Sequence, residues 1–457
     1  MMKQYALLAL LCLSGAPGAK AQQTLSLEQC RTMALASNKE MAAAARQTDA
    51  ARYTARSYKG LFFPNLTARA TGLYSTADGG YHAEGGQLPV FAVGAGGVPS
   101  QMPMFAYFPG LDLNYKVGAM FLGGIQLEQP LYTGGKIRSA YRTAQLGNEM
   151  AQMNETLTGA NVILQTDNAY AQVVKAMEMK KVAERYNALL AELLRNVESA
   201  RKHGLKLQND VLKVQVKLNE SELALRKADN ALRLATMNLC HLIGRPLDDD
   251  ISVNDGFPET EQCTEPTNAD ISARPEYALL EKREEMAQQQ IRLTRSELLP
   301  TIGLQGSLNY LYGLELNNEP LFDKGNFTVL LNVSLPIYHF GERTHKVKAA
   351  RARLEQTRLE RENLNEQMLL ELTQATNNLD EARMECTLAG RSLEQAEENL
   401  RVSKSQFDAG LEPLSEHLEA QALWQQAYET SVEARYQLYL SHVKYRKAAG
   451  TLYSQRR

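Results

Sequence analysis

The sequence predicts a mainly α-helical fold in which two tandem repeats each contribute a β-hairpin to a transmembrane β-barrel. Three features lead to this fold class: a long stretch without proline, a second copy of that stretch, and segments of alternating apolar and polar residues. In each repeat, we expect the hairpin to precede two long antiparallel helices that form a coiled coil.

A long helical signal covers residues 343–409, which contain no proline and a single glycine, Gly390. Apolar or small residues recur there at alternating steps of three and four, the 3.5-residue period of a coiled-coil seam. The seam consists of Leu372, Ala375, Leu379, Ala382, Cys386, Ala389, Leu393, Ala396, Leu400 and Phe407, with Ser403 filling the last gap. Because Gly410 can end a helix and Pro413 suits the first turn of the next, we expect a tight turn there.

The same pattern occurs 206 residues earlier in the chain. Three motif pairs define this offset: Pro130-Leu131-Tyr132 with Pro336-Ile337-Tyr338, Gly135 with Gly341, and Gly204-Leu205 with Gly410-Leu411. Upstream, Pro64 matches Pro300 at an offset of 236, so the first copy carries 30 extra residues. A set of matches in one register indicates a tandem duplication.

The chain divides in order along these repeats. The expected order is a signal peptide (1–21), a first repeat (22–243), a mixed equatorial insertion (244–273), a second repeat (274–450) and a C-terminal tail (451–457). Lys3, an apolar run and Ala19-Lys20-Ala21 are typical of a secretory signal. Each repeat opens with a helix, the first over residues 25–59. The long helices are expected at 136–203, 209–242, 343–409 and 413–449.

Four strands are predicted, at about 63–74 and 119–132 in the first repeat and at about 300–312 and 326–338 in the second. In the last of these, alternate residues from Phe327 to Ile337 are apolar and most residues between them are polar, with Leu330 as the exception. Such alternation suits either a membrane barrel or a half-buried soluble sheet. The signal peptide, together with the lack of a run of roughly 20 apolar residues, favours the barrel.

Strand number then sets the assembly. Four strands cannot close a barrel, and an open strand edge is costly in lipid. Because the smallest bacterial barrels have about eight strands, several chains must share one barrel, and three chains would supply about twelve. A homotrimer in the outer-membrane lipid is therefore the expected assembly. The glycine-rich residues 75–117, which hold the excess of the first copy, are expected to form a long loop.

The composition indicates no enzyme site. Seven histidines and the four cysteines that follow the signal peptide fit no metal-ligand spacing, and no phosphate loop or nucleophile elbow is present. We therefore expect no catalytic residue, cofactor or metal. A formal charge of −2 argues against nucleic-acid binding. His203 and His417, near the two predicted turns, are expected to be solvated at helix ends.

The ordered set of motifs resembles the TolC family of outer-membrane efflux channels. The motifs that carry the resemblance are Phe63-Pro64-Asn65-Leu66, Gln129-Pro130-Leu131-Tyr132, Arg274-Pro275-Glu276, Leu299-Pro300-Thr301-Ile302, Leu335-Pro336-Ile337-Tyr338 and the two Gly-Leu turns. The resemblance implies a trimer with a twelve-stranded barrel and a helical periplasmic tunnel. It also implies a periplasmic adaptor and an inner-membrane transporter as partners, for efflux or type I secretion. The turn residues that would dock the adaptor are Gly204, Leu205, Gly410 and Leu411.

The resemblance also implies an acidic ring that narrows the tunnel near its tip. The matching residues are Glu416 and Glu419, which share one helix face, and Asp210 in the first copy. A ring of carboxylates would attract cations. Alternatively, these are ordinary acidic residues near helix N-termini, where the macrodipole favours them. Glu412 stands where some family members carry a basic residue that ties the gate shut.

A different class of function is also compatible with the helices. A periplasm-spanning coiled-coil scaffold without a pore would explain the long helices and their seam. It would not explain the alternating strands or the duplication of the hairpin.

Overall fold

The computed structural model describes residues 23–90, 104–254, 256–258, 271–320 and 324–452. The predicted signal peptide and most of the tail therefore lie outside the described residues. The chain falls into two compact units, of which the helical one comprises Met1–Ala51, Leu146–Glu285 and Gln356–Arg457. The other comprises Arg52–Gln145 and Met286–Glu355 and holds the long strands.

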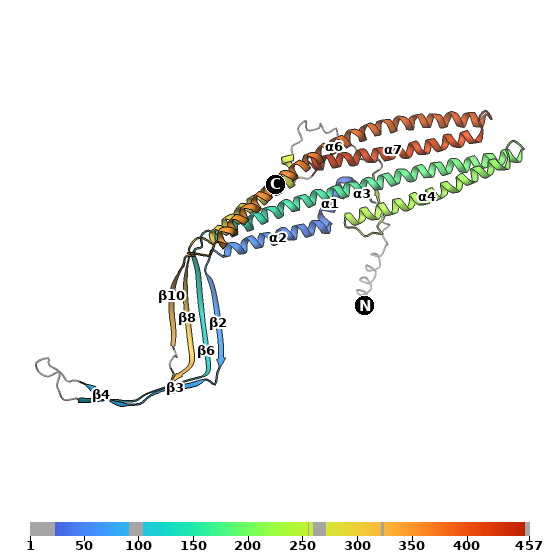
Figure 1. The fold of residues 1–457 in the computed structure, drawn as a ribbon. Coiled ribbons are helices and arrows are strands. Elements are labelled where there is room, and N and C mark those ends of the chain that lie inside the picture. Colours follow the sequence, from blue (N-terminus) through green and yellow to red (C-terminus); the bar gives the residue numbers. More distant parts are fainter. Residues whose placement is uncertain (1–22, 91–103, 255, 259–270, 321–323, 453–457) are drawn as a thin grey trace, which may run out of the picture. The chain divides into compact units, whose positions relative to one another are not determined.

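Two helical hairpins dominate the helical unit (Figure 1). The first consists of α3 (Lys136–Lys202) and α4 (Gln208–Leu242), and the second of α6 (Glu342–Asp408) and α7 (Leu414–Ala448). The outgoing helices both have 67 residues and the returning helices both have 35, as a duplication requires. Among the described residues, no helix has the length and apolarity needed to cross a bilayer.

The predicted seam is the buried edge of α6. Every seam residue from Leu372 to Phe407 is buried or half-buried, and Ser403 is buried with them. Near the ends of the hairpins, Leu193 and Val197 of α3 pack in one apolar cluster with Val211 of α4 and Leu414 of α7. The seam therefore joins helices of both repeats into one core.

The N-terminal segment differs from the single helix predicted over 25–59. β1 (Gln23–Leu25) is followed by α1 (Leu27–Ser37) and α2 (Lys39–Gly60). Asn38 separates the helices: its backbone is extended, and its side-chain Oδ1 accepts the N–H of Glu40 at 2.8 Å. Asparagine can hydrogen-bond to nearby backbone in this way, which ends one helix and starts the next.

Short elements connect the repeats. β1 pairs in parallel with β7 (Ile251–Val253), which lies within the predicted insertion. A turn of 3-10 helix (Ile271–Ala273) precedes α5 (Pro275–Ser296). The first helix of the unit is held by Arg31 of α1, whose guanidinium donates two hydrogen bonds of 2.7 and 2.6 Å to the fully buried Asp167 of α3.

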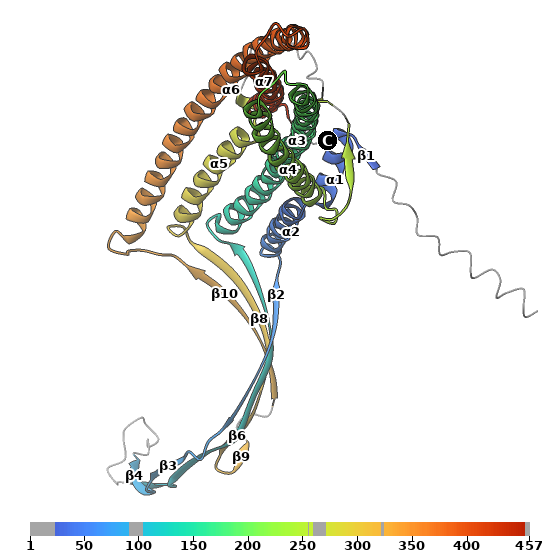
Figure 2. The ribbon, with the colours of Figure 1, turned by 90° about the vertical axis from the view of Figure 1, so that its right-hand side faces the viewer.

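Four long antiparallel strands form the main sheet of the second unit, in the order β10-β8-β6-β2 (Figure 2). Their bounds are β2 Asn65–Tyr74, β6 Leu111–Tyr132, β8 Thr301–Leu316 and β10 Lys324–Ser334. The two-residue strand β9 (Glu319–Pro320) pairs with the end of β8. Within the described chain, β2 and β10 are the edges of this sheet.

The strand register separates polar from apolar residues over the width of the sheet. One row across the four strands reads Thr67, Gln126, Ser307 and Thr328. The adjacent row reads Ala68, Ile125, Leu308 and Phe327. Successive residues in a strand point to opposite faces, so one face is polar and the other apolar. Leu330, the exception predicted from the sequence, lies in a polar row beside Gln305.

Two expectations about the strands are wrong. Residues 75–117 are not a loop throughout, because β3 (Asp78–Ala83) extends the pairing along β6 and β4 (Gly86–Val90) pairs with β5 (Met104–Phe108). Gly79 of β3 allows close packing there: a Cβ on this residue would lie 2.9 Å from the Tyr115 ring. Residues 91–103 lie outside the described part.

The end of the last strand also differs from the prediction. β10 ends at Ser334, whereas the sequence predicted strand to residue 338. Ser334 pairs with Thr301, the first residue of β8, so the residues after Ser334 have no partner in that strand.

Candidate functional site

The candidate site lies at the ends of the two helical hairpins, where the sequence analysis placed the docking turns and the acidic ring. Gly204 and Gly410 adopt φ values of +74° and +75°, which glycine reaches without strain. The following N–H groups of Leu205 and Leu411 donate to the carbonyls of Ala200 and Gln406 at 2.9 Å, the pattern that closes a helix. The side chains of Leu205 and Leu411 are 76% and 81% exposed.

The predicted acidic residues have different environments. Glu416 and Glu419 are exposed on the first turns of α7. Asp210 is half-buried, and its Oδ2 accepts the backbone N–H of Leu207 at 3.1 Å, which satisfies a free donor at the start of α4. In the described part of the chain, no hydrogen bond or ion pair joins Asp210, Glu416 and Glu419 to one another.

Glu412 belongs to a buried chain of polar side chains that the sequence analysis did not find. We call Ser403, Glu412, His417 and Gln421 the tip network. Ser403 Oγ lies 2.8 Å from Glu412 Oε1 and 2.9 Å from His417 Nδ1. On the other side of the ring, His417 Nε2 lies 3.0 Å from Gln421 Nε2. The tip network links the last turns of α6 to the first turns of α7.

The chemistry of the groups fixes the direction of these hydrogen bonds. An ionised carboxylate only accepts, so the Ser403 hydroxyl donates to Glu412. That hydroxyl oxygen then accepts from His417 Nδ1–H, and the unprotonated Nε2 accepts from the amide of Gln421. This arrangement of donors and acceptors corresponds to a neutral imidazole with its proton on Nδ1.

His417 corrects the expectation that histidines at the tips are solvated. Its side chain is only 4% exposed, whereas His203 at the other turn is exposed. Burial lowers the pKa of His417, and nearby Lys404 lowers it further; Glu412 and Asp408 act in the opposite direction. The signal available in the sequence was Ser403, a polar residue at a seam position that needs a buried partner.

Aromatic contacts extend the tip network to the first hairpin. The rings of Phe407 and His417 stack with centroids 4.8 Å apart and planes 10° apart. Lys206, in the turn after α3, places its Nζ 4.8 Å from the centroid of the Phe407 ring. Lys404 Nζ lies 3.4 Å from Glu192 of α3. The second hairpin is thus held to the first by contacts close to both turns.

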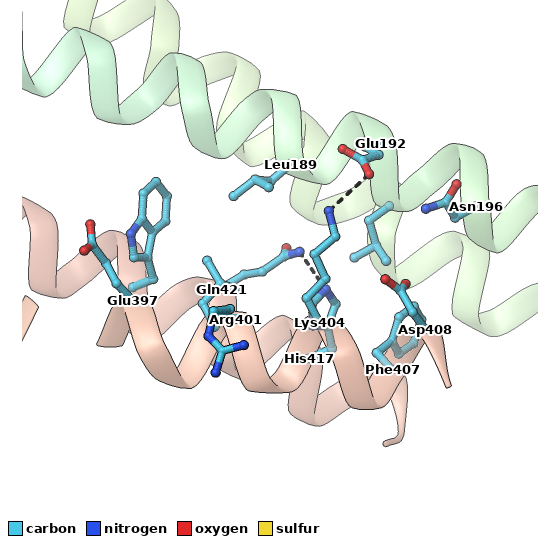
Figure 3. A pocket seen from close by; sticks show the side chains of 13 residues that line it. Leu189, Glu192, Asn196, Glu397, Arg401, Lys404, Phe407, Asp408, His417 and Gln421 are labelled. Atoms are coloured by element: carbon cyan, nitrogen blue, oxygen red, sulfur yellow. Dashed lines mark hydrogen bonds and ion pairs between the residues drawn. The ribbon is translucent and has the colours of Figure 1, made fainter. Parts of the chain in front are cut away.

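A pocket of about 320 Å³ lies between α3 and the pair α6 and α7 (Figure 3). We call it the tip pocket. Its lining residues are Leu189, Glu192, Leu193, Asn196, Glu397, Leu400, Arg401, Lys404, Phe407, Asp408, His417, Gln421 and Trp424. Among the described residues, no group of three or more metal-binding side chains could hold a metal ion.

Comparison with known proteins identifies the family. The model of the family described as outer membrane efflux protein matches residues 31–245 and 271–451. The chain belongs to this family. As an outer membrane efflux protein, it is a channel component located in the outer membrane of a Gram-negative type of cell.

Individual relatives have low sequence identity to this chain but match most of its length. Outer membrane protein TolC of Vibrio cholerae is 23% identical over 340 residues, which cover 73% of this chain and 77% of the relative. The pyoverdine export outer membrane protein OpmQ of Pseudomonas aeruginosa is 24% identical, over 76% of this chain and 70% of the relative. The named relatives are transport proteins rather than enzymes.

Solved structures share the fold of this efflux protein. The outer membrane protein VceC from Vibrio cholerae matches with a TM-score of 0.74 and 16% identity, covering 93% of this chain and 96% of VceC. The outer membrane channel CmeC of Campylobacter jejuni matches with a TM-score of 0.75 and 18% identity, covering 94% of this chain and 87% of CmeC. The mainly helical fold class with an added β domain is thereby confirmed.

Proposed function

We propose that three copies of this chain form one channel that conducts substrate passively from the periplasm to the outside. The observation that carries the proposal is the sheet, whose opposite faces are polar and apolar and whose edge strands are β2 and β10. The apolar face, including Val329, Leu331 and Phe327, is exposed in the single chain. Twelve strands from about three chains would pair every edge and turn the apolar face to lipid.

Two neighbouring substitutions test this arrangement. Val329→Arg places a charge on the apolar face, where a barrel in lipid loses about 2–4 kcal/mol per chain near the bilayer midplane. Thr328→Arg places the same charge on the polar face and serves as the matched control. We expect the heat-modifiable trimer band and the bilayer conductance to disappear with Val329→Arg alone. Equal assembly of both variants would contradict a channel wall built from this sheet.

We further propose that substrate enters through a periplasmic adaptor and an inner-membrane transporter that engage the turns. Leu205 and Leu411 support this proposal because large exposed apolar side chains at both turns are available to a partner. The chain would receive its substrate from the transporter and catalyse no reaction itself. Leu205→Asp together with Leu411→Asp should abolish the cross-link that the unmodified chain forms to a periplasmic adaptor, without loss of the trimer band. Unchanged cross-linking in the double variant would place the docking surface elsewhere.

The acidic ring remains part of the proposal. Three copies would bring exposed Glu416 and Glu419 side chains together at the narrow end of the tunnel. Glu416→Ala with Glu419→Ala should change conductance or block by multivalent cations in planar bilayers. Glu429→Ala, an exposed acidic position farther along α7, is the control. If the double variant and the control behave alike, the acidic ring has no role in the gate.

A coiled-coil scaffold without a pore receives no support from a specific observation. The two-faced sheet favours the channel, since a scaffold has no use for an apolar face beside a polar one.

A further inference from the structure

The tip pocket has features that the channel function does not require. It is bounded on one side by α3 of the first hairpin and on the other by α6 and α7 of the second. At about 320 Å³, it has the size of a small ligand site. Its walls include the side chains of Leu193, Leu400, Phe407 and Trp424.

One polar atom in the pocket is left without a partner. Gln421 is 2% exposed, and its amide nitrogen is committed to His417 by the direction of the tip network. Its carbonyl Oε1 is buried and, within the described part of the chain, has no hydrogen-bond donor. A buried acceptor without a donor is unfavourable and is uncommon in folded proteins.

The charged side chains that line the pocket are all exposed. Lys404 Nζ and Glu192 Oε1 lie 3.4 Å apart, and each of these side chains is 50% exposed (Figure 3). This ion pair crosses from the second hairpin to the first. Arg401 is paired with Glu398 on its own helix. The other charged residues of the lining, Glu397 and Asp408, are exposed as well, so the buried part of the pocket is lined by apolar side chains, His417 and Gln421 and favours a neutral occupant.

We propose that the tip pocket binds a small neutral aromatic molecule that carries one hydrogen-bond donor, in the chemical class of phenols and indoles. The donor would satisfy Gln421 Oε1, and the ring would pack on the apolar walls, which are aromatic on the side of α6 and α7. A volume of about 320 Å³ accommodates a single ring rather than a helix of a partner protein.

Such a ligand contacts both hairpins at once. It therefore binds more tightly to the arrangement in which α3 lies against α6 and α7, and it shifts the population towards that arrangement. If the hairpin ends form the gate, which rests on the proposed function, the ligand holds the gate closed. Binding itself does not depend on that function and can be measured separately.

The chain provides its own reporter, because Trp424 is its single tryptophan and lines the pocket. We would titrate the detergent-solubilised full chain with 4-bromophenol, whose bromine quenches indole emission on contact. Bromobenzene serves as the probe without a donor. Saturable quenching by 4-bromophenol is expected, with weaker binding of bromobenzene.

Substitutions separate this site from non-specific partitioning. Gln421→Met removes the acceptor with little change in volume and should weaken 4-bromophenol binding about tenfold while leaving bromobenzene unchanged. Gln425→Met, the same change on the same helix outside the pocket, is the matched control. Leu189→Phe reduces the pocket volume from α3 without touching the tip network, so it keeps the test valid if Gln421→Met does not fold.

The outcomes are distinct. Saturable quenching that is weakened by Gln421→Met or by Leu189→Phe supports the site. Quenching that rises linearly and equally in all variants, or occupancy of the pocket by ordered water only, overturns it. A confirmed site with no effect on bilayer conductance would leave binding intact and remove the link to the gate.

Discussion

Replacing His417 by alanine is the sharpest test of how the hairpin end is held. The substitution removes two hydrogen bonds of the tip network and the stacking contact with Phe407. At about 1 kcal/mol for each hydrogen bond and about 1 kcal/mol for the stack, the start of α7 loses about 3 kcal/mol. Local opening of that segment should then become roughly a hundredfold more frequent.

Hydrogen exchange measured by mass spectrometry reports this opening directly. We expect peptides covering residues 411–424 to exchange about a hundredfold faster in His417→Ala, with little change in the middle of the coiled coil. His203→Ala, at the exposed histidine of the other turn, is the control and should behave like the unmodified chain. Unchanged protection of residues 411–424 would show that the tip network does not hold the second hairpin.

Three further predictions follow from the structure. Burial lowers the pKa of His417, so the folded chain binds fewer protons than the unfolded chain below the ordinary pKa of about 6.5. The stability of the hairpin end, measured by hydrogen exchange, should therefore fall as pH drops from about 6.5 towards the folded pKa. In His417→Gln, this pH dependence of stability should be lost. Asp167→Asn should destabilise the helical unit by about 3 kcal/mol in thermal melts, because it removes the fully buried carboxylate that pairs with Arg31 of α1 and leaves this guanidinium paired with the exposed Glu28. Asp229→Asn, at an exposed ion pair, should leave the melting temperature unchanged. Gly410→Ala should lower the free energy of unfolding by about 1 kcal/mol, because φ is +75° at this residue. Gly390→Ala, in a helix with open space around the glycine, should raise it by about 0.5–1 kcal/mol. Equal effects of the two substitutions in thermal melts would contradict this interpretation of the two glycines.

The sequence was most informative where the relevant physics is local. The 3.5-residue spacing on α6 marks its buried edge because residues three and four apart share a helix face. Strand alternation separates the two faces of the sheet for a similar reason, with a period of two. The break at Asn38 was missed because its effect depends on one side chain bonding to the backbone of Glu40.

The ribbon formed by β3, β4 and β5 was missed for a different reason. Its glycines and prolines are typical of loops, yet pairing between residues 14 to 38 apart supplies the backbone with partners. At the candidate site, the turns at Gly204 and Gly410 were predictable because a left-handed residue favours glycine. The acidic residues on α7 were found from the resemblance, while their role as a ring stays a prediction.

By itself, the sequence determined the duplication, the long helices, the tight turns between them and the two-faced strands, because each follows from residue spacing within a few turns or pleats. Only the tertiary structure decided that His417 is buried between Ser403 and Gln421, that Glu412 accepts from Ser403, and that Gln421, which lines a pocket, has a buried carbonyl without a donor among the described residues. These properties arise where α3, α6 and α7 meet. Burial and hydrogen-bond direction depend on all the groups gathered at one point, and spacing along the chain does not contain that information.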